Sequence, residues 1–179
     1  MSYQTIDEIY VANNQFRTLF AETVMGIFPA ELNALPDGEK WSIKGIVEHV
    51  SIVDEGMAKI CRKLLSEAQS NEMRSRGEIM VSDVFRAYTD NMDDMKLEAP
   101  EHVWPTGERT VEESQRIIDE NQIMFESLRT LFREFNGTSL KFLHPYFGPL
   151  SAQDWLVLSG EHMRRHTNQI QKVVEKIRQ

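Results

Sequence analysis

Four long segments of this chain repeat their apolar residues at the spacing of an α-helix, and this pattern restricts the fold more than any other feature. They cover about residues 6–28, 43–65, 111–135 and 152–177. Each follows a residue that commonly caps helices, namely Thr5, Ser42, Thr110 and Ser151. Thr5 with Glu8 also fits the capping-box pattern. Because amphipathic helices of this length bury their apolar stripes against one another, the sequence predicts an all-α four-helix bundle.

A polar stretch of about residues 66–109 separates the second segment from the third. We expect a short helix in VSDVFRAYTD, whereas the prolines of EAPEHVWPTGE favour an extended or turn-like backbone. No part of the chain reads as a convincing strand, and no internal repeat is evident. The expectation is therefore one domain over residues 1–179, with a long connection between the second and third helices.

The overall composition narrows the class of protein. Apolar residues make up 41% and charged residues 27%, which is ordinary for a globular domain. The net charge of -8 argues against a nucleic-acid partner, because phosphate binding needs a basic surface. The sequence has no long apolar run, no signal-peptide pattern at its start and a single cysteine, Cys61. We therefore expect a cytoplasmic protein with no membrane partner and no internal disulfide.

Histidines lie among the apolar residues of two segments. His162 and His166 are four residues apart on the inward side of the last segment, so their imidazoles occupy neighbouring turns of one face. Two core histidines, each hydrogen-bonded to a neighbouring helix, would explain this pair alone. His49, at the edge of the second segment's apolar stripe, adds a third imidazole. Burying three imidazoles leaves few hydrogen-bond partners and makes protonation costly, whereas one divalent cation satisfies all three.

The sequence therefore predicts a metal site formed by His49, His162 and His166. Three protein ligands leave a coordination position open, as in reactive rather than structural sites. Imidazole ligands suit zinc, nickel, iron or copper and do not choose among them.

Other polar residues on inward faces have competing interpretations. Asn13, Asn121 and Ser159 can orient a ligand or line a pocket, but hydrogen bonds between helices are the favoured interpretation. Glu48 and Glu161 each precede a candidate ligand and point about 100° away on the helical wheel, so we expect both to be solvated.

Small residues beside the candidate ligands also admit two interpretations. Gly45 and Gly56 flank His49 on the helical wheel, which indicates either free space or close helix packing. Cys61 lies on the same apolar stripe and is expected to be a small core residue rather than a nucleophile.

Two longer motifs resemble a known family. KWSIKGIVEHV (40–50) resembles the Trp-Ser…His entry of the DinB-like, YfiT-type superfamily of four-helix-bundle proteins. HPYFGPLSAQDWLVLSGEHMRRHTNQI (144–170) resembles its second signature, a His-Pro-x-Phe-Gly turn followed by a cap, a tryptophan, His-x-x-x-His and a glutamine. The order and spacing agree along nearly the whole chain. Of the motif residues, Trp41 and His144 are expected to be structural, since the proline and glycine already shape the turn.

The resemblance implies a divalent metal held by three side chains, which carry over onto His49, His162 and His166, and it implies frequent homodimers. Some members of this superfamily are S-transferases that use bacillithiol, mycothiol or glutathione, and one branch is a thiol-dependent maleylpyruvate isomerase. Some members have a carboxylate where this chain has His162, so this chain looks closer to the YfiT-type pattern than to the isomerase.

Three functions follow as expectations. The first is a metal-dependent S-transferase acting on a small-molecule substrate with a low-molecular-weight thiol. The second is a metal-dependent hydrolase, in which the ion activates water. The third is a non-enzymatic, metal-binding stress protein, because a fold alone does not decide function.

Overall fold

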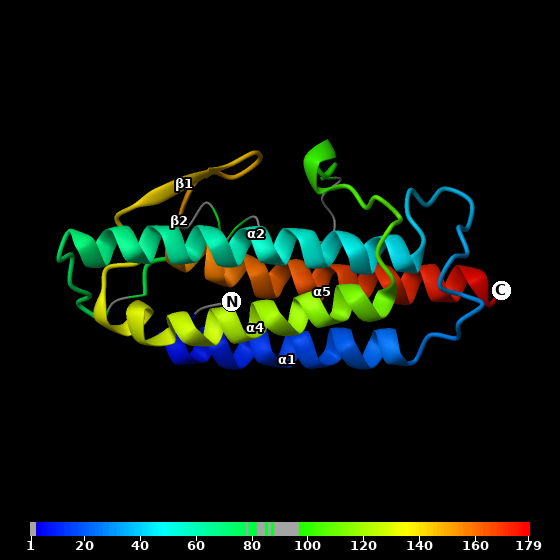
Figure 1. The fold of residues 1–179 in the computed structure, drawn as a ribbon, viewed down its shortest axis with the longest axis horizontal. Helices are drawn as coiled ribbons and strands as arrows, with labels where there is room; N and C mark the ends of the chain where they lie inside the picture. Colours follow the sequence, from blue (N-terminus) through cyan, green and yellow to red (C-terminus); the bar gives the residue numbers. More distant parts are fainter. Residues whose placement is uncertain (1–2, 78, 82–84, 86, 88–96) are drawn as a thin grey trace.

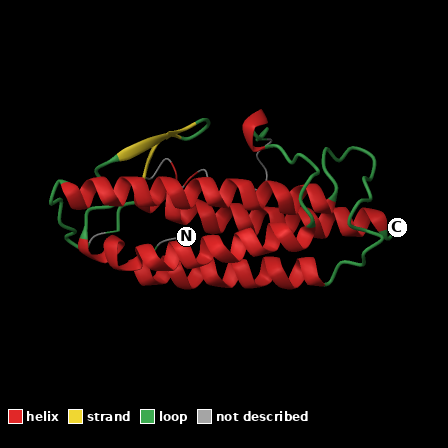
Figure 2. Ribbon diagram, in the orientation of Figure 1, coloured by secondary structure: helices red, strands yellow, loops and turns green. Residues whose placement is uncertain are grey.

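The computed structural model describes residues 3–77, 79–81, 85, 87 and 97–179. Four helices form a bundle (Figures 1 and 2): α1 (Ile6–Met25), α2 (Ile43–Ser70), α4 (Val111–Glu134) and α5 (Ala152–Ile177). The predicted all-α four-helix bundle is confirmed. None of the described helices has both the length and the hydropathy that a membrane span requires.

Two helix ends differ from the expected ones. The first helix ends at Met25 rather than near residue 28, because Gly26 caps it before the proline is reached. The second continues to Ser70 rather than stopping near residue 65, so the connection between the second and third helices begins about five residues later than expected.

The directions of the helices explain the long connection. Helices α1 and α5 run one way, and α2 and α4 run the opposite way (Figure 1). Helix α2 packs against both α4 and α5, and α1 packs against α5. Since α2 and α4 are parallel, the chain must return along the bundle, about 40 Å for a helix of this length. The short 3₁₀ helix η1 (Glu101–Val103) belongs to this connection. Apart from Val81, Phe85 and Ala87, the segment VSDVFRAYTD lies outside the described residues.

Helix caps follow the sequence closely. Thr110 and Ser151 form complete capping boxes with Glu113 and Asp154. Ser42 caps α2 by accepting a hydrogen bond from the backbone N–H of Gly45. The capping box predicted at the start of α1 is only half formed. The Thr5 hydroxyl accepts from Glu8 N, but the Glu8 carboxylate accepts from Gln4 N rather than from Thr5 N.

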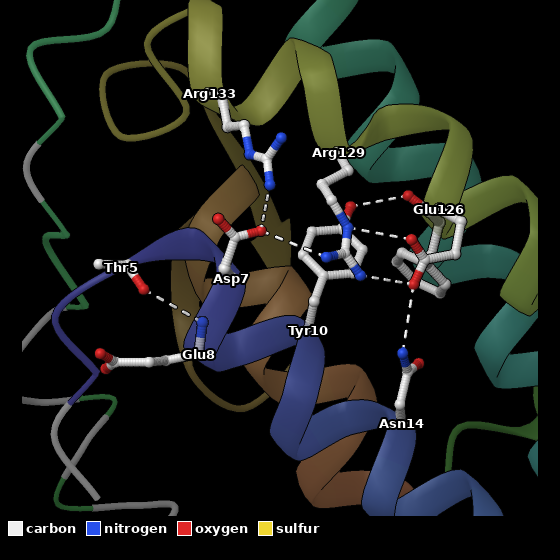
Figure 3. Close-up of polar contacts among 9 residues, drawn as sticks. Thr5, Asp7, Glu8, Tyr10, Asn14, Glu126, Arg129 and Arg133 are labelled. Atoms are coloured by element: carbon white, nitrogen blue, oxygen red, sulfur yellow. Dashed lines mark hydrogen bonds and ion pairs between the residues drawn. The ribbon is translucent and has the colours of Figure 1, made fainter.

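Polar side chains link the start of α1 to the end of α4 (Figure 3). Asp7 accepts hydrogen bonds from Arg129 and Arg133, and Arg129 also pairs with Glu126. The Arg129 guanidinium lies 4.2 Å from the centre of the Tyr10 ring, while the Tyr10 hydroxyl donates to the Phe125 carbonyl. Exposed ion pairs each contribute at most about 1 kcal/mol, so these contacts chiefly orient α1 against α4.

A β-hairpin precedes α5, so the expectation that the chain contains no strand is wrong. Strands β1 (Lys141–His144) and β2 (Gly148–Ser151) pair in antiparallel register, from Lys141 opposite Ser151 to His144 opposite Gly148. Each strand has four residues and β1 is largely exposed, so the sequence shows no alternating apolar pattern. Gly148, with φ of +70°, permits the return of the chain.

Helices α1 and α5 approach closely at Gly160. A β-carbon on Gly160 would lie 2.0 Å from Asn13 Oδ1. The Asn13 amide is held in place because it donates to Leu156 O at 2.8 Å and to Ser159 Oγ at 3.3 Å. By contrast, a β-carbon on Gly56, in the middle of α2, would meet no atom within 4 Å. Only one of these two helical glycines is therefore required for packing.

Alanine substitutions at the two glycines are expected to have opposite effects. Gly160→Ala must displace the Asn13 amide, so we expect a loss of about 1–3 kcal/mol in the free energy of unfolding. Gly56→Ala removes only the entropic cost of a helical glycine and should stabilise the protein by about 0.5–1 kcal/mol. Urea unfolding followed by circular dichroism measures both. Stabilisation by Gly160→Ala would contradict the close approach of α1 and α5.

Candidate metal centre

Three imidazoles converge between α2 and α5. One ring nitrogen each from His49, His162 and His166 lies within 4.8 Å of the others. The Nε2 atoms of His162 and His166 are 3.1 Å apart. Two imidazole nitrogens on one tetrahedral zinc ion would be about 3.4 Å apart, given bonds of about 2.1 Å. The nitrogens of the cluster need to approach by at most about 1.4 Å to reach this spacing, so shifts of less than about 1 Å in each of two rings are enough. This cluster can hold a metal ion.

Hydrogen bonds fix which nitrogen is free in two of the rings, those of His49 and His166. His49 Nδ1 lies 2.8 Å from the carbonyl oxygen of Val103. A carbonyl only accepts, so His49 carries its proton on Nδ1 and keeps a lone pair on Nε2. His166 Nδ1 lies 2.8 Å from Gln169 Oε1, which gives the same tautomer. Metal-binding histidines commonly donate their second ring N–H in this way, so the donor set fits a metal ion.

The three imidazoles are neutral at neutral pH. Burial lowers the pKa of His49, and it lowers the pKa of His166 to about 3. Burial, together with repulsion from the neighbouring imidazoles, also places the pKa of His162 well below its ordinary value. Neutral imidazole is the form that binds metal, so no proton has to be removed from these rings at neutral pH. His162 keeps partial exposure to solvent, whereas His49 and His166 are buried.

The lowered pKa values predict acid sensitivity of the metal-free protein. Below about pH 6.5 an unfolded chain binds protons on these histidines that the folded chain does not bind, so stability falls as the pH decreases. For His166, with a folded pKa of about 3, the loss is about 1.4 kcal/mol per pH unit until that pKa is reached. Urea unfolding of chelator-treated protein at several pH values between neutrality and pH 4.5 measures the slope. His166→Gln should make the slope less steep, while His49 and His162 still contribute, and an unchanged slope in that variant would contradict the assignment.

Glu48 and Glu161 are buried, so the prediction that both are solvated is wrong. Their exposed fractions are 1% and 3%. The Glu161 carboxylate accepts a hydrogen bond of 2.8 Å from Arg164 on the same helix. Glu48 instead faces the segment before α4, which covers this side of α2. A helical wheel shows only which side of its own helix a residue occupies. It cannot show that a loop from elsewhere in the chain buries that side.

Glu48 binds that segment through both of its carboxylate oxygens. Oε1 accepts from Thr106 N at 3.1 Å and from Thr106 Oγ1 at 2.7 Å, and Oε2 accepts from Gly107 N at 2.8 Å. Burial by itself would raise the pKa of Glu48, but these hydrogen bonds outweigh it and the pKa is lowered. Glu48, which precedes the candidate ligand His49 in the sequence, is therefore ionised, and both of its carboxylate oxygens accept hydrogen bonds.

Comparison with known proteins agrees with this geometry. A model of the DinB superfamily matches residues 12–170, which include all three histidines. The chain belongs to the DinB superfamily. It is also similar to the uncharacterized protein YuaE of Bacillus subtilis (strain 168), with 23% identity over 166 residues, covering 92% of this chain and 96% of YuaE. Among solved structures, none matches the chain significantly. Membership of the DinB superfamily and the histidine cluster together indicate a metal-binding role.

The other polar residues considered in this DinB-superfamily chain bridge helices. Asn13 on α1 donates to Leu156 O and Ser159 Oγ on α5, and Asn121 on α4 approaches Ser51 O on α2 at 3.5 Å. Within the described part of the chain, neither amide hydrogen-bonds to an imidazole of the cluster. Their favoured interpretation, as hydrogen bonds between helices, agrees with these contacts.

His144 lies in the hairpin, and its contacts there agree with the expected structural role. Its Nδ1 accepts from the backbone N–H groups of Tyr146 and Phe147, and its ring stacks on Phe147 with centroids 4.4 Å apart. Burial lowers the pKa of His144 to about 4. The Tyr146 hydroxyl donates to the carbonyl of Glu98, so the hairpin tip contacts the segment before α4.

Trp41 and Cys61 also have the environments expected for structural residues. The Trp41 ring lies against His49, with centroids 4.7 Å apart, so it packs directly on a candidate ligand. The Cys61 thiol is fully buried in the core, and burial raises its pKa. A buried thiol with a raised pKa is a poor nucleophile.

The sequence did not reveal which groups orient the candidate ligands, although the motif around His166 includes Gln169. Gln169 lies three positions after His166 on the same helix, and this spacing places the two side chains next to each other, so their contact could have been predicted. The Val103 carbonyl is a backbone group of a distant segment, so no residue type or spacing in the sequence predicts its contact with His49. A buried ion pair between Arg17 and Asp54 was also missed, although both residues lie within predicted helices.

Proposed function

We propose that this protein holds one divalent metal ion through His49, His162 and His166 and activates a low-molecular-weight thiol for transfer to an electrophilic small molecule. The convergence of three ring nitrogens within 4.8 Å carries the proposal. The hydrogen bonds at His49 and His166 support it because they occupy the Nδ1 atoms and leave the Nε2 lone pairs free for an ion. Membership of the DinB superfamily supports it independently.

The residues of the cluster determine what the ion contributes. When bound, the ion supplies Lewis acidity that lowers the pKa of a thiol or water beside it. Three neutral imidazoles leave its positive charge uncompensated, and three protein ligands leave a position open. The partial exposure of His162 gives solvent-borne molecules access to that side of the cluster.

The surroundings of the cluster favour a thiol over water as the nucleophile. Among the described residues, the cluster contains no carboxylate. Both oxygens of Glu48 accept hydrogen bonds from Thr106 and Gly107, and Glu161 pairs with Arg164. Activating water usually needs a positioned general base, whereas a thiol, with an ordinary pKa of about 8.5, ionises readily beside a cation.

The test is an S-transfer assay with the metal-loaded protein. We expect monochlorobimane to be consumed in the presence of at least one of bacillithiol, mycothiol and glutathione, and consumption to cease in His162→Ala. His102→Ala is the matched control, since His102 is exposed and lies outside the cluster. Metal-dependent ester or amide hydrolysis without thiol would replace the transferase with a hydrolase. Stoichiometric metal without either activity would identify a metal-binding protein that is not an enzyme.

A further inference from the structure

The segment from Val103 to Gly107 is fastened to α2 beside the candidate metal centre. Glu48 receives three hydrogen bonds from Thr106 and Gly107. A β-carbon on Gly45, one turn before His49 on α2, would lie 3.5 Å from Cγ of Pro105, so the segment also packs closely on the helix backbone. Gly107 adopts a φ of +80°, a conformation that glycine tolerates best, in the turn that presents its N–H to Glu48.

The same segment provides the hydrogen-bond partner of a candidate ligand. The Val103 carbonyl, three residues before Thr106, accepts the hydrogen bond from His49 Nδ1 at 2.8 Å. Glu48 and His49 are adjacent in α2 and point in different directions, so the segment contacts two sides of the helix. A carboxylate this deeply buried is costly unless donors surround it, and the three donors of this segment meet that need.

We propose that Glu48 is a positioning residue for His49: it fixes the Thr106–Gly107 turn, and the turn keeps the Val103 carbonyl against His49 Nδ1. The His49 lone pair is thereby held on Nε2, facing His162 and His166. Glu48 itself does not bind the metal. This inference rests on the proposed metal function and assigns the orientation of one ligand to a residue outside the cluster.

The test compares Glu48→Gln and Glu48→Ala with a matched control. Glu161→Gln is that control, because it neutralises a buried carboxylate that also precedes a candidate ligand but pairs with Arg164 on its own helix. Long-range ¹H–¹⁵N spectra of metal-free protein report the tautomer of His49. We expect the Nδ1–H form in the natural protein and in Glu161→Gln, and a mixture of tautomers in Glu48→Ala. Glu48→Gln keeps one acceptor oxygen and should be intermediate.

Zinc affinity, measured by competition with a chromophoric chelator, provides the second readout. Removing a group that orients a metal ligand commonly costs about 10–100-fold in affinity, and we expect a loss of this size for Glu48→Ala. If Glu48→Ala lowers thermal stability but keeps the His49 tautomer and the zinc affinity of Glu161→Gln, the positioning role is wrong and Glu48 only fastens the loop. If Glu48→Ala does not fold, Glu48→Gln decides by the same criteria.

The two readouts separate this inference from the proposed function. A natural protein that binds no zinc would refute the metal function. The tautomer of His49 would still be measurable in that case, because the spectra are recorded without metal. A natural protein that binds zinc, with His49 unaffected by changes at Glu48, would refute only the positioning role.

Discussion

Replacing His49, His162 or His166 with alanine is expected to reduce bound metal from one ion per chain to trace amounts. The three ring nitrogens lie within 4.8 Å of one another, and each would supply one bond to the ion. Removing one leaves two protein ligands, fewer than the three usual in a catalytic zinc site. Elemental analysis of protein purified without a histidine tag measures the occupancy.

Helical content should change little in these variants, because the hydrophobic clusters of the bundle are formed by other residues. The control is His102→Ala, whose side chain is exposed in the segment before α4 and should leave occupancy unchanged. Full occupancy in any one of the three alanine variants would show that the corresponding histidine is not a ligand.

Breaking the ion pair between Arg17 and Asp54 is expected to have the largest effect on stability. Arg17 donates to both carboxylate oxygens, at 2.9 and 2.6 Å, and the two residues are only 6% and 2% exposed. The Arg17 guanidinium also lies over the Phe125 ring, 5.3 Å from its centre. Asp54→Ala leaves a buried cation without its partner, so we expect a loss of about 3–5 kcal/mol in the free energy of unfolding.

The paired substitution separates the cost of a broken pair from the contribution of the pair itself. Arg17→Met with Asp54→Leu removes both charges and keeps apolar volume, so it should cost much less than the two single changes together. Urea unfolding of the four proteins gives the coupling energy. Additive losses would contradict the description of these residues as one buried unit.

The helices and their caps were largely predictable because both depend on local sequence. Apolar spacing and Ser42, Thr110 and Ser151 located three helix starts, and the structure places them there. The end of α2 at Ser70 was harder to predict from the sequence, since no glycine or proline marks the end of a helix near residue 65. The hairpin escaped prediction because its strands pair only with each other and β1 is mostly exposed.

The candidate site likewise has one part that the local sequence predicts and another that depends on contacts between distant segments. His162 and His166 are neighbours on one helix, so their spacing alone indicates a shared face. Bringing His49 to them depends on how α2 packs on α5. Its place at the edge of an apolar stripe indicated this packing, and the resemblance to the DinB-like superfamily supported it. The burial of Glu48 and its bonds to Thr106 and Gly107 depend on a segment about 60 residues away in the chain, which no local pattern encodes.

X-ray absorption spectroscopy of zinc-loaded protein, prepared without a histidine tag, tests the metal centre most directly. Coordination by His49, His162 and His166 predicts one zinc ion per chain with three imidazole nitrogens at about 2.0–2.1 Å and at least one further light atom. Sulfur in the coordination shell, fewer than three imidazoles, or occupancy far below one ion per chain would contradict it.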